Sequence, residues 1–507
     1  MDHGVSEEVS GDDPERGSRR ESLLLRFLLW LPQAIVVGAF LLFLIVAPLP
    51  LGANRDWAWA PMVVVIGAIA AGGMLATIGS DGWRVALDER APLVALLVCF
   101  FLMVGVALLQ MTTLPPPAGS ARYYAQAAEI LGQAHAAVPS LAVDASRNTL
   151  LKCVACALIF VLARALFDSP KRARLLLLAF GASGAIVTAY AVFVQPATGF
   201  CYVGSFLKKQ TVFAETDRCM MSGTFVSSNN FGCFCGMALV AVIALMFFER
   251  RRRPDFDGDE DGAGGWAARF LTWITGTRLA LLGLAFLFLG CLMISGSRAG
   301  FAATIAGVMA LLFLMMRERW TTRGQLGRAF LVGIAVAVMI GLLAGGQMVR
   351  KISFFRQADT FDRVIIWRAA VDAIGQSPWW GWGLGSFADI YAVYQPTEII
   401  QPNDKAHSTP LETVVELGIP GAIPAWLVVL IPWAISLRGA WRRRRRHRYL
   451  PAGAFAVSGV AILHSIVDFS LQIPAIGFVV SALLGMGWAQ AFSRTAPARW
   501  GFTSKGG

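Results

Sequence analysis

Charge is what this sequence lacks most. Only 15% of its 507 residues are charged, and 56% are hydrophobic, whereas soluble globular proteins carry roughly 25% charged residues. The mean hydropathy of +0.60 excludes a disordered chain and an ordinary soluble enzyme. Cysteine is sparse too, at eight residues, which excludes a scaffold built on disulfides. A polytopic membrane protein is the class that remains.

Recognisable metal and nucleotide motifs are missing as well. The chain has five histidines, and no pair of them stands at metal-ligand spacing. No DxD-type pair occurs in the outer loops, and no glycine-rich phosphate loop precedes a helix. We therefore expect no metal and no cofactor. The net charge of +12 would suggest nucleic acid in a soluble protein, but the positive-inside bias of membrane proteins explains it better.

Long apolar runs are what the sequence does contain. A bilayer-spanning helix needs about 20 mostly apolar residues. The runs are continuous rather than alternating, which favours helices over strands. We predict an all-α polytopic integral membrane protein of about 12 transmembrane helices. The spans lie near 27–50, 58–79, 92–112, 148–167, 174–194, 226–248, 278–296, 300–316, 329–346, 411–436, 451–467 and 474–493.

The distribution of basic residues predicts the orientation. An even number of spans places both termini on one side, and most of the 44 Lys and Arg residues fall there, including the run Arg442 to Arg446. This side is therefore predicted to be cytoplasmic, with the basic runs touching anionic membrane lipids. We expect the following divisions: a disordered cytoplasmic N-terminus at 1–26, the transmembrane domain at 27–493, a cytoplasmic linker at 249–277, a large folded outer loop at 347–410 and a cytoplasmic tail at 494–507.

The end of the large outer loop holds the candidate catalytic residue, His407. Thr409 as N-cap, Pro410 at the next position and Glu412 three residues after Thr409 predict a helix start. His407 would then lie just before a helix N-terminus, which attracts anions. Ser408 and Thr409 are candidate supporting residues. A cluster of Gly and Pro residues beginning at Gly418 predicts a break in the same span.

Three arginines on the outer side are candidates for holding a diphosphate. Arg298 lies between two apolar runs with no room for a loop, and Arg363 and Arg368 share a predicted helix in the outer loop. An arginine near the membrane is costly and should have an anionic partner. Arginine binds phosphate bidentately without a metal, and a histidine can take a proton from an attacking hydroxyl.

Further candidate site residues have two interpretations each. The faces of Trp379, Trp380 and Trp382 could stack on sugars, or the three could form an aromatic belt at the membrane surface. His464 and Asp468 either support the site or make structural hydrogen bonds between span ends. The asparagines at 229 and 230 open a span, where hydrogen bonds between helices are expected.

The cysteines leave one question open. Cys201 and Cys219 share an outer loop, where a disulfide is as plausible as two free thiols. Cys153 and Cys156 form a CxxC inside an apolar span, without the context of a redox motif.

An ordered set of short motifs resembles the bacterial O-antigen ligase and O-antigen polymerase superfamily. The resemblance covers most of the membrane chain, without the tails and the acidic linker. The motifs are P-L-G-A-N-R at 50–55, T-F-V-S-S-N-N-F at 224–231, G-S-R-A-G at 296–300, Arg363 with I-I-W, G-W-G-L-G-S-F at 381–387, His407-Ser followed by G-I-P-G at 418–421, and H-S-I-V-D-F-S at 464–470.

The resemblance implies a GT-C-like membrane glycosyltransferase in the bacterial inner membrane, with its active site facing the periplasm. The reaction would be metal-independent and inverting. The donor would be a glycan on undecaprenyl diphosphate, and the acceptor lipid A–core for a ligase or another glycan for a polymerase. By position, His407 would be the catalytic base, and Arg298 and Arg363 would hold the diphosphate. A different class, a lipid-linked sugar transporter or flippase, should show related halves, and the sequence shows no internal repeat.

Overall fold

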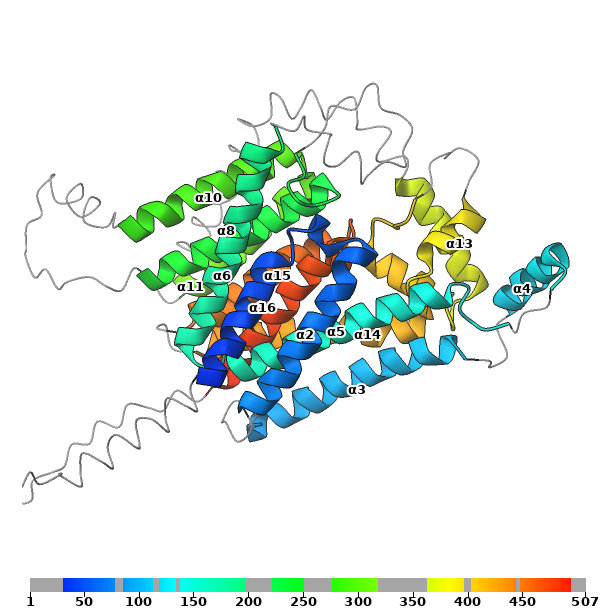
Figure 1. Ribbon diagram of the computed structural model, residues 1–507, viewed down its shortest axis with the longest axis horizontal. Coiled ribbons are helices and arrows are strands. Elements are labelled where there is room, and N and C mark those ends of the chain that lie inside the picture. The colour runs from blue at the N-terminus through cyan, green and yellow to red at the C-terminus, as the bar shows by residue number, and fades with distance from the viewer. Residues whose placement is uncertain are drawn as a thin grey trace, which may run out of the picture.

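The computed structural model describes residues 31–77, 85–112, 118–133, 137–196, 221–249, 276–317, 363–395, 403–443 and 447–493, and these ranges are helical with no strand. Figure 1 shows one bundle of long helices with shorter helices gathered beyond one end. The all-α polytopic membrane fold predicted from the apolar runs is confirmed. The predicted span at 329–346 lies outside the described residues.

Nine helices of the described ranges are long and apolar enough to cross a membrane. They are α2 (Asp56–Thr77), α3 (Leu87–Gln110), α5 (Val143–Leu166), α6 (Pro170–Ala189) continued by the π-helix η3 (Tyr190–Val194), α8 (Ser228–Glu249), α10 (Gly276–Ser295), α11 (Arg298–Met316), α14 (Thr409–Arg442) and α16 (Pro474–Phe492). Two shorter apolar helices, Leu31–Val46 and α15 (Tyr449–His464), coincide with two more predicted spans.

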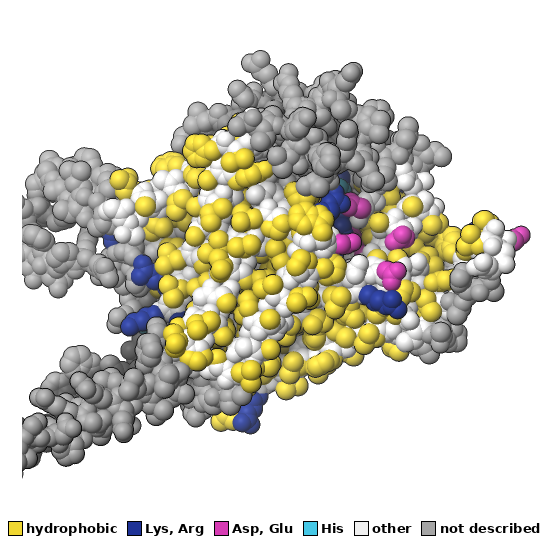
Figure 2. All heavy atoms as spheres, in the orientation of Figure 1, with side chains coloured by type: hydrophobic (Ala, Val, Ile, Leu, Met, Phe, Trp, Pro, Cys, Tyr) yellow, Lys and Arg dark blue, Asp and Glu magenta, His cyan; other side chains and the backbone are white. Residues whose placement is uncertain are grey.

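Two of these helices form the centre of the bundle. The apolar stretches of α8 and α16 are 83% and 89% buried, whereas that of α3 is 17% buried. Side chains of α5, α6, α8, α11, α15 and α16 share one continuous hydrophobic core. Large apolar side chains stay exposed on the outer helices, including Val64, Phe101 and Phe286. Figure 2 shows that hydrophobic side chains form a broad yellow surface on one face of the bundle. Such a surface suits contact with lipid.

Hydrogen bonds at the helix ends define the two ends of the bundle. At one end of the bundle, Glu89 at the start of α3 accepts hydrogen bonds from Arg164 at the end of α5, at 2.6 Å, and from Trp488 near the end of α16, at 2.8 Å. At the other end, the starts of α8 and α14 meet the segment that follows α15. The first end is called the Glu89 end below, and the second the His407 end.

The chain turns between α10 and α11 within two residues, as the sequence predicted. Gly296 adopts a left-handed backbone with φ of 71°. The hydroxyl of Ser297 then caps α11 by accepting the N–H of Gly300 at 3.1 Å. Arg298 is therefore fixed at the first turn of α11, at the His407 end.

A small lobe covers part of the His407 end. It comprises α4 (Ala118–Leu131), a helix at 363–376 and α13 (Phe387–Tyr394), and Figure 1 shows α4 and α13 beyond the ends of α3 and α14. Its hydrophobic core surrounds Trp382 and includes Ile366, Phe387 and Tyr391. The described parts of the 347–410 loop are thus folded, and α4 joins them from a different loop.

The predicted break in the span after His407 is present. At Gly418 of α14 the backbone has φ of 67° and ψ of 173°, which is not helical. The carbonyls of Val415 and Glu416 accept the N–H groups of Trp382 at 3.0 Å and Gly383 at 2.9 Å instead. The glycine-rich turn of the lobe therefore replaces the hydrogen bonds that the helix loses, as backbone within a membrane protein requires.

Candidate active site

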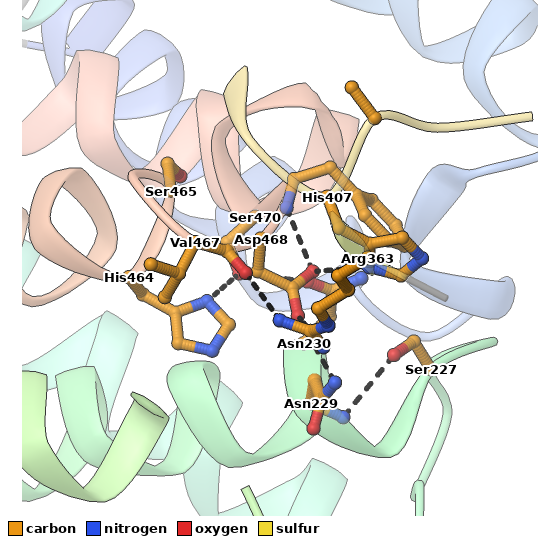
Figure 3. Close-up of polar contacts among 12 residues, drawn as sticks. Ser227, Asn229, Asn230, Arg363, His407, His464, Ser465, Val467, Asp468 and Ser470 are labelled. Carbon is orange, nitrogen blue, oxygen red and sulfur yellow. Dashed lines mark hydrogen bonds and ion pairs between the residues drawn. The ribbon is translucent and has the colours of Figure 1, made fainter. Parts of the chain in front are cut away.

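A buried carboxylate organises the polar side chains at the His407 end. Asp468 is 1% exposed and follows α15 in the short link to α16. One carboxylate oxygen accepts a hydrogen bond from Asn229 of α8 at 3.1 Å and lies 3.8 Å from an Arg363 nitrogen. Figure 3 shows Asp468 between His464 on one side and Arg363 and His407 on the other. These residues, distant in sequence, form one group.

His407 faces this carboxylate. Its Nδ1 lies 4.0 Å from Oδ1 of Asp468, and its side chain is 26% exposed. The imidazole contacts the ring of Phe469 edge to face, with centroids 5.2 Å apart. Its backbone is left-handed, with φ of 50°, a conformation that costs a non-glycine residue about 1–3 kcal/mol and occurs most often at functional sites. A partly exposed imidazole beside a buried carboxylate is the pairing expected of a general base.

Arg363 ties the lobe to this group. Its Nη1 donates to the carbonyl of Val467 at 2.7 Å, and its Nη2 is the nitrogen near Asp468. Both contacts reach the same link between α15 and α16. The anionic partner that an arginine near the membrane should have is therefore, for Arg363, the carboxylate of Asp468.

His464 belongs to the same group but is buried at 1% exposure. Its Nδ1 shares a 2.8 Å hydrogen bond with Ser470, and Ser470 donates to Asn230 of α8 at 2.8 Å. Its Nε2 lies 3.4 Å from the hydroxyl of Ser297. His464 therefore connects α15, α8 and the turn before Arg298.

The start of α14 differs from the prediction. The N-cap residue is Ser408, not Thr409, and no side-chain capping bond forms. The N–H of Thr409 donates to the carbonyls of Ser465 at 2.9 Å and Asp468 at 3.2 Å. Carbonyl oxygens therefore hold the first N–H of the helix. Thr409 anchors the residues around Asp468 instead.

Glu412 also has a different role from the predicted capping box. Its carboxylate accepts the N–H of Ala406 at 2.9 Å and the ammonium of Lys405 at 3.1 Å. Desolvation lowers the pKa of Lys405, but the carboxylates of Glu412 and Glu416 outweigh it and raise the pKa above its usual value. Lys405 is therefore charged at neutral pH and pairs with Glu412.

The other two predicted arginines are exposed. Arg298 follows Ser297, which contacts His464, so Arg298 emerges beside the group. Arg368 lies on the exposed face of the 363–376 helix and, within the described residues, does not contact Asp468. The structure thus brings together His407, Arg363, His464 and Asp468, places Arg298 next to them and leaves Arg368 apart.

The three tryptophans separate into two kinds. Trp382 is fully buried, donates to the carbonyl of Ala373 at 2.8 Å and lies against Tyr123 and Tyr394. The prediction that it presents a face to sugar, or to lipid, is therefore wrong, because both faces are covered by the core of the lobe. Trp379 and Trp380 are 69% and 43% exposed, so their rings remain accessible.

Several residues with polar contacts at the site were not predicted as site residues from the sequence. They are Asn229, Asn230, Trp367, Lys405 and Glu412. A usable signal existed for Glu412, because acidic residues inside an apolar run are rare and usually functional. Asn229 and Asn230 form the expected bonds between helices, but their partners lie around Asp468, more than 200 positions along the chain. No local pattern reveals such a pairing.

Metal ligands and disulfides do not contribute to the site as described. Within the described ranges, no group of three or more His, Cys, Asp or Glu residues is placed to hold a metal ion. Cys153 and Cys156 are free thiols on α5. Cys201 and Cys219 lie outside the described residues.

The fold and this group define a multi-pass membrane protein with a histidine, a carboxylate and an arginine assembled at one end of its bundle. Residues 282–424 match the family model for O-antigen ligase. The matched segment contains Arg298, Arg363 and His407, whereas His464 and Asp468 lie beyond it. The match confirms the resemblance to the O-antigen ligase and polymerase type of membrane glycosyltransferase. No curated protein matches the chain.

Proposed function

We propose that this protein is an O-antigen ligase that transfers a glycan from undecaprenyl diphosphate to a hydroxyl of lipid A–core. The observation that carries the proposal is the partly exposed His407, which lies inside the segment that matches the O-antigen ligase family and faces the buried Asp468. The proposed location is the bacterial inner membrane, with the His407 end facing the periplasm and both termini in the cytoplasm. This orientation follows the positive-inside rule.

The proposed reaction is a single, inverting displacement. His407 takes the proton of the acceptor hydroxyl, whose oxygen forms a bond to the anomeric carbon of the donor glycan. The bond from that carbon to the diphosphate oxygen breaks, and its electron pair leaves with undecaprenyl diphosphate. Since Nδ1 of His407 faces Asp468, Nε2 is the nitrogen that receives the proton. The carboxylate then stabilises the imidazolium that forms.

The arginines would compensate the charge of the leaving group. Arg298 is exposed beside the group and would contact the diphosphate directly. Arg368 is exposed on the same helix as Arg363 and would add positive charge at the edge of the site. Arg363 is held by Val467 and Asp468, so its part is to keep positive charge near the reacting centre and to fix Asp468. Fixed cations aimed at developing negative charge act without a metal or cofactor. Trp379 and Trp380 offer exposed rings for sugar stacking, while Ser408, Thr409 and His464 keep the group in place.

The test is complementation of a deletion strain with the wild-type protein or with His407→Ala. Surface lipopolysaccharide is separated on gels, and lipid-linked glycans are extracted alongside. We expect long glycans to accumulate on undecaprenyl diphosphate in the deletion strain and with His407→Ala, and the wild-type protein to restore them to lipid A–core. Both proteins should be present in equal amounts in the membrane.

Other outcomes would assign other functions. Single unpolymerised repeats on the core would identify a polymerase of the same superfamily, and donor confined to the cytoplasmic leaflet would identify a transporter. Near-normal transfer by His407→Ala would overturn the proposed base. Addition of imidazole to His407→Gly membranes provides a second check, because partial recovery of transfer requires that the missing group be the base.

A further inference from the structure

The backbone around His407 is held on both sides by other residues. On the N-terminal side, Ala406 is fully buried, and both of its backbone polar groups have side-chain partners. Its N–H donates to Glu412 at 2.9 Å, and its carbonyl accepts the indole N–H of Trp367 at 2.9 Å. The peptide groups that flank Ala406 are therefore fixed from two different helices, the 363–376 helix and α14.

The C-terminal side is held from a third segment. Thr409 donates its N–H to the carbonyls of Ser465 and Asp468, and its hydroxyl donates to the same Asp468 carbonyl at 3.2 Å. Only His407 and Ser408 lie between the two anchored residues. Asp468 therefore supplies both the carboxylate that faces His407 and the carbonyl that fixes the following backbone.

The residue between these anchors has the strained conformation. His407 has φ of 50°, and a left-handed non-glycine residue persists only where surrounding contacts impose it. A relaxed backbone at this position would rotate the Cα–Cβ bond and carry the imidazole away from Asp468. The surrounding bonds are thus the physical reason that the ring faces the carboxylate.

From these contacts we infer that Glu412 and Trp367 are positioning residues, which grip Ala406 and thereby hold His407 in its left-handed conformation against Asp468. The inference rests on the proposed function, because it treats His407 as the base. Lys405 completes the grip through its 3.1 Å contact with the other oxygen of Glu412, which neutralises the buried carboxylate.

The experiment measures kcat and KM for purified, reconstituted protein. The donor is undecaprenyl-diphosphate-linked glycan from the deletion strain, and the acceptor is lipid A–core. The variants are Glu412→Ala, Glu412→Gln and Trp367→Phe, with rates normalised to folded protein. Gln keeps an oxygen that can accept the Ala406 N–H, and Phe keeps the ring of Trp367 but removes its N–H donor.

The chain offers closely matched controls at other places. Trp433 donates its indole N–H to the carbonyl of Phe455 at 2.9 Å, so Trp433→Phe removes the same kind of bond away from His407. Glu89 is buried, accepts a backbone N–H and pairs with Arg164, so Glu89→Ala matches Glu412→Ala at the opposite end. Asp404→Asn removes an exposed charge next to Lys405.

A displaced general base lowers kcat more than it changes substrate binding. We expect kcat to fall about 100-fold in Glu412→Ala, because a displacement of the base by about 1 Å costs roughly 100-fold in rate. A smaller displacement in Trp367→Phe should lower kcat about tenfold. KM for the donor should stay within about threefold, and Glu412→Gln should recover most of the loss. The three controls should keep wild-type kcat per folded molecule.

The results separate this inference from the proposed function. An inactive His407→Ala together with wild-type kcat in both Trp367→Phe and folded Glu412→Ala would overturn the positioning role alone. Near-normal transfer by His407→Ala would overturn the proposed base, and the positioning role with it. Equal kcat losses in Trp433→Phe and Trp367→Phe would mean a general effect on the bundle and would also overturn the inference.

Discussion

Asp468 combines deep burial with contacts to three polar side chains, from α8, the lobe and the loop before α14. Its carboxylate is within hydrogen-bond distance of Asn229 and within ion-pair distance of Arg363 and His407. A carboxylate at 1% exposure is costly unless its charge is compensated. Removing its charge takes away the carboxylate that faces Arg363 and His407, so we expect the proposed chemistry to suffer.

The variant Asp468→Asn tests this expectation. The amide keeps nearly the same shape but cannot stabilise an imidazolium, and we expect kcat to fall by about 100-fold or more. Transfer in reconstituted membranes measures the effect, and gel filtration in detergent checks the fold. Asp404→Asn, at an exposed position in the loop before α14, serves as the control. An unchanged kcat in Asp468→Asn would contradict the role of the carboxylate.

Trp382 and Trp379 should respond differently to truncation, although they are three residues apart. Trp382→Ala leaves a cavity in the core of the lobe and should lower stability by about 3–5 kcal/mol. Trp379 is 69% exposed, so Trp379→Ala should leave stability within about 0.5 kcal/mol of the wild type. Thermal unfolding in detergent compares the two. Similar losses would mean that Trp379 also packs in a core.

At the scale of the elements, the break in α14 depends on one glycine. An added Cβ at Gly418 would lie 2.5 Å from the carbonyl oxygen of Trp379, and φ is 67°. The glycine turn of the lobe cannot move away, since its N–H groups bond the carbonyls freed by the break.

Gly418→Ala should therefore detach the lobe from α14 and destabilise the protein by about 1–3 kcal/mol or more. Limited proteolysis should show faster cleavage within 377–386 than in the wild type. Gly290, where an added Cβ meets nothing within 4 Å, provides the matched control Gly290→Ala. Unchanged proteolysis of Gly418→Ala would show that the lobe does not depend on this break.

The elements were largely predictable because the signals for them are local. A run of about 20 apolar residues predicts a transmembrane helix wherever it occurs. The turn at Gly296 follows from two apolar runs with no room for a loop, and the break at Gly418 follows from a cluster of Gly and Pro residues. The exact start of α14 was not predictable, since Ser408 and Thr409 are both favourable N-caps and tertiary bonds decide between them. The prediction for Trp382 was wrong for a related reason, because protein cores and membrane interfaces both favour tryptophan.

The site was predictable only in part. His407, Arg363, His464 and Asp468 were recognised from motifs, and the structure brings them together. Their connections to Asn229, Trp367 and Glu412 required the packing of segments far apart in sequence. Periodicity records which face of a helix is apolar, but it does not record which helix lies opposite.

At the scale of the whole molecule, the Glu89 end and the His407 end of the bundle differ in the polar groups that they hold. The Glu89 end is closed by Glu89, Arg164 and Trp488, far from the proposed chemistry. Glu89→Ala should cost about 3–5 kcal/mol, because Arg164 and Trp488 both lose the buried carboxylate that they bond. The unfolding midpoint should fall while kcat of the folded protein stays constant. A change in kcat would indicate coupling between the ends.

The central position of α16 has a consequence for biogenesis. This helix is 89% buried, yet it follows in the chain all the helices that it packs against, among them α5, α14 and α15. During synthesis those helices leave the ribosome first and must wait, in lipid or beside the insertion machinery, for the helix that they will surround. A chain that stops before Pro474 therefore lacks the helix at the centre of the bundle. We expect membrane proteases to degrade this truncated chain, and we do not expect it to work as a smaller protein.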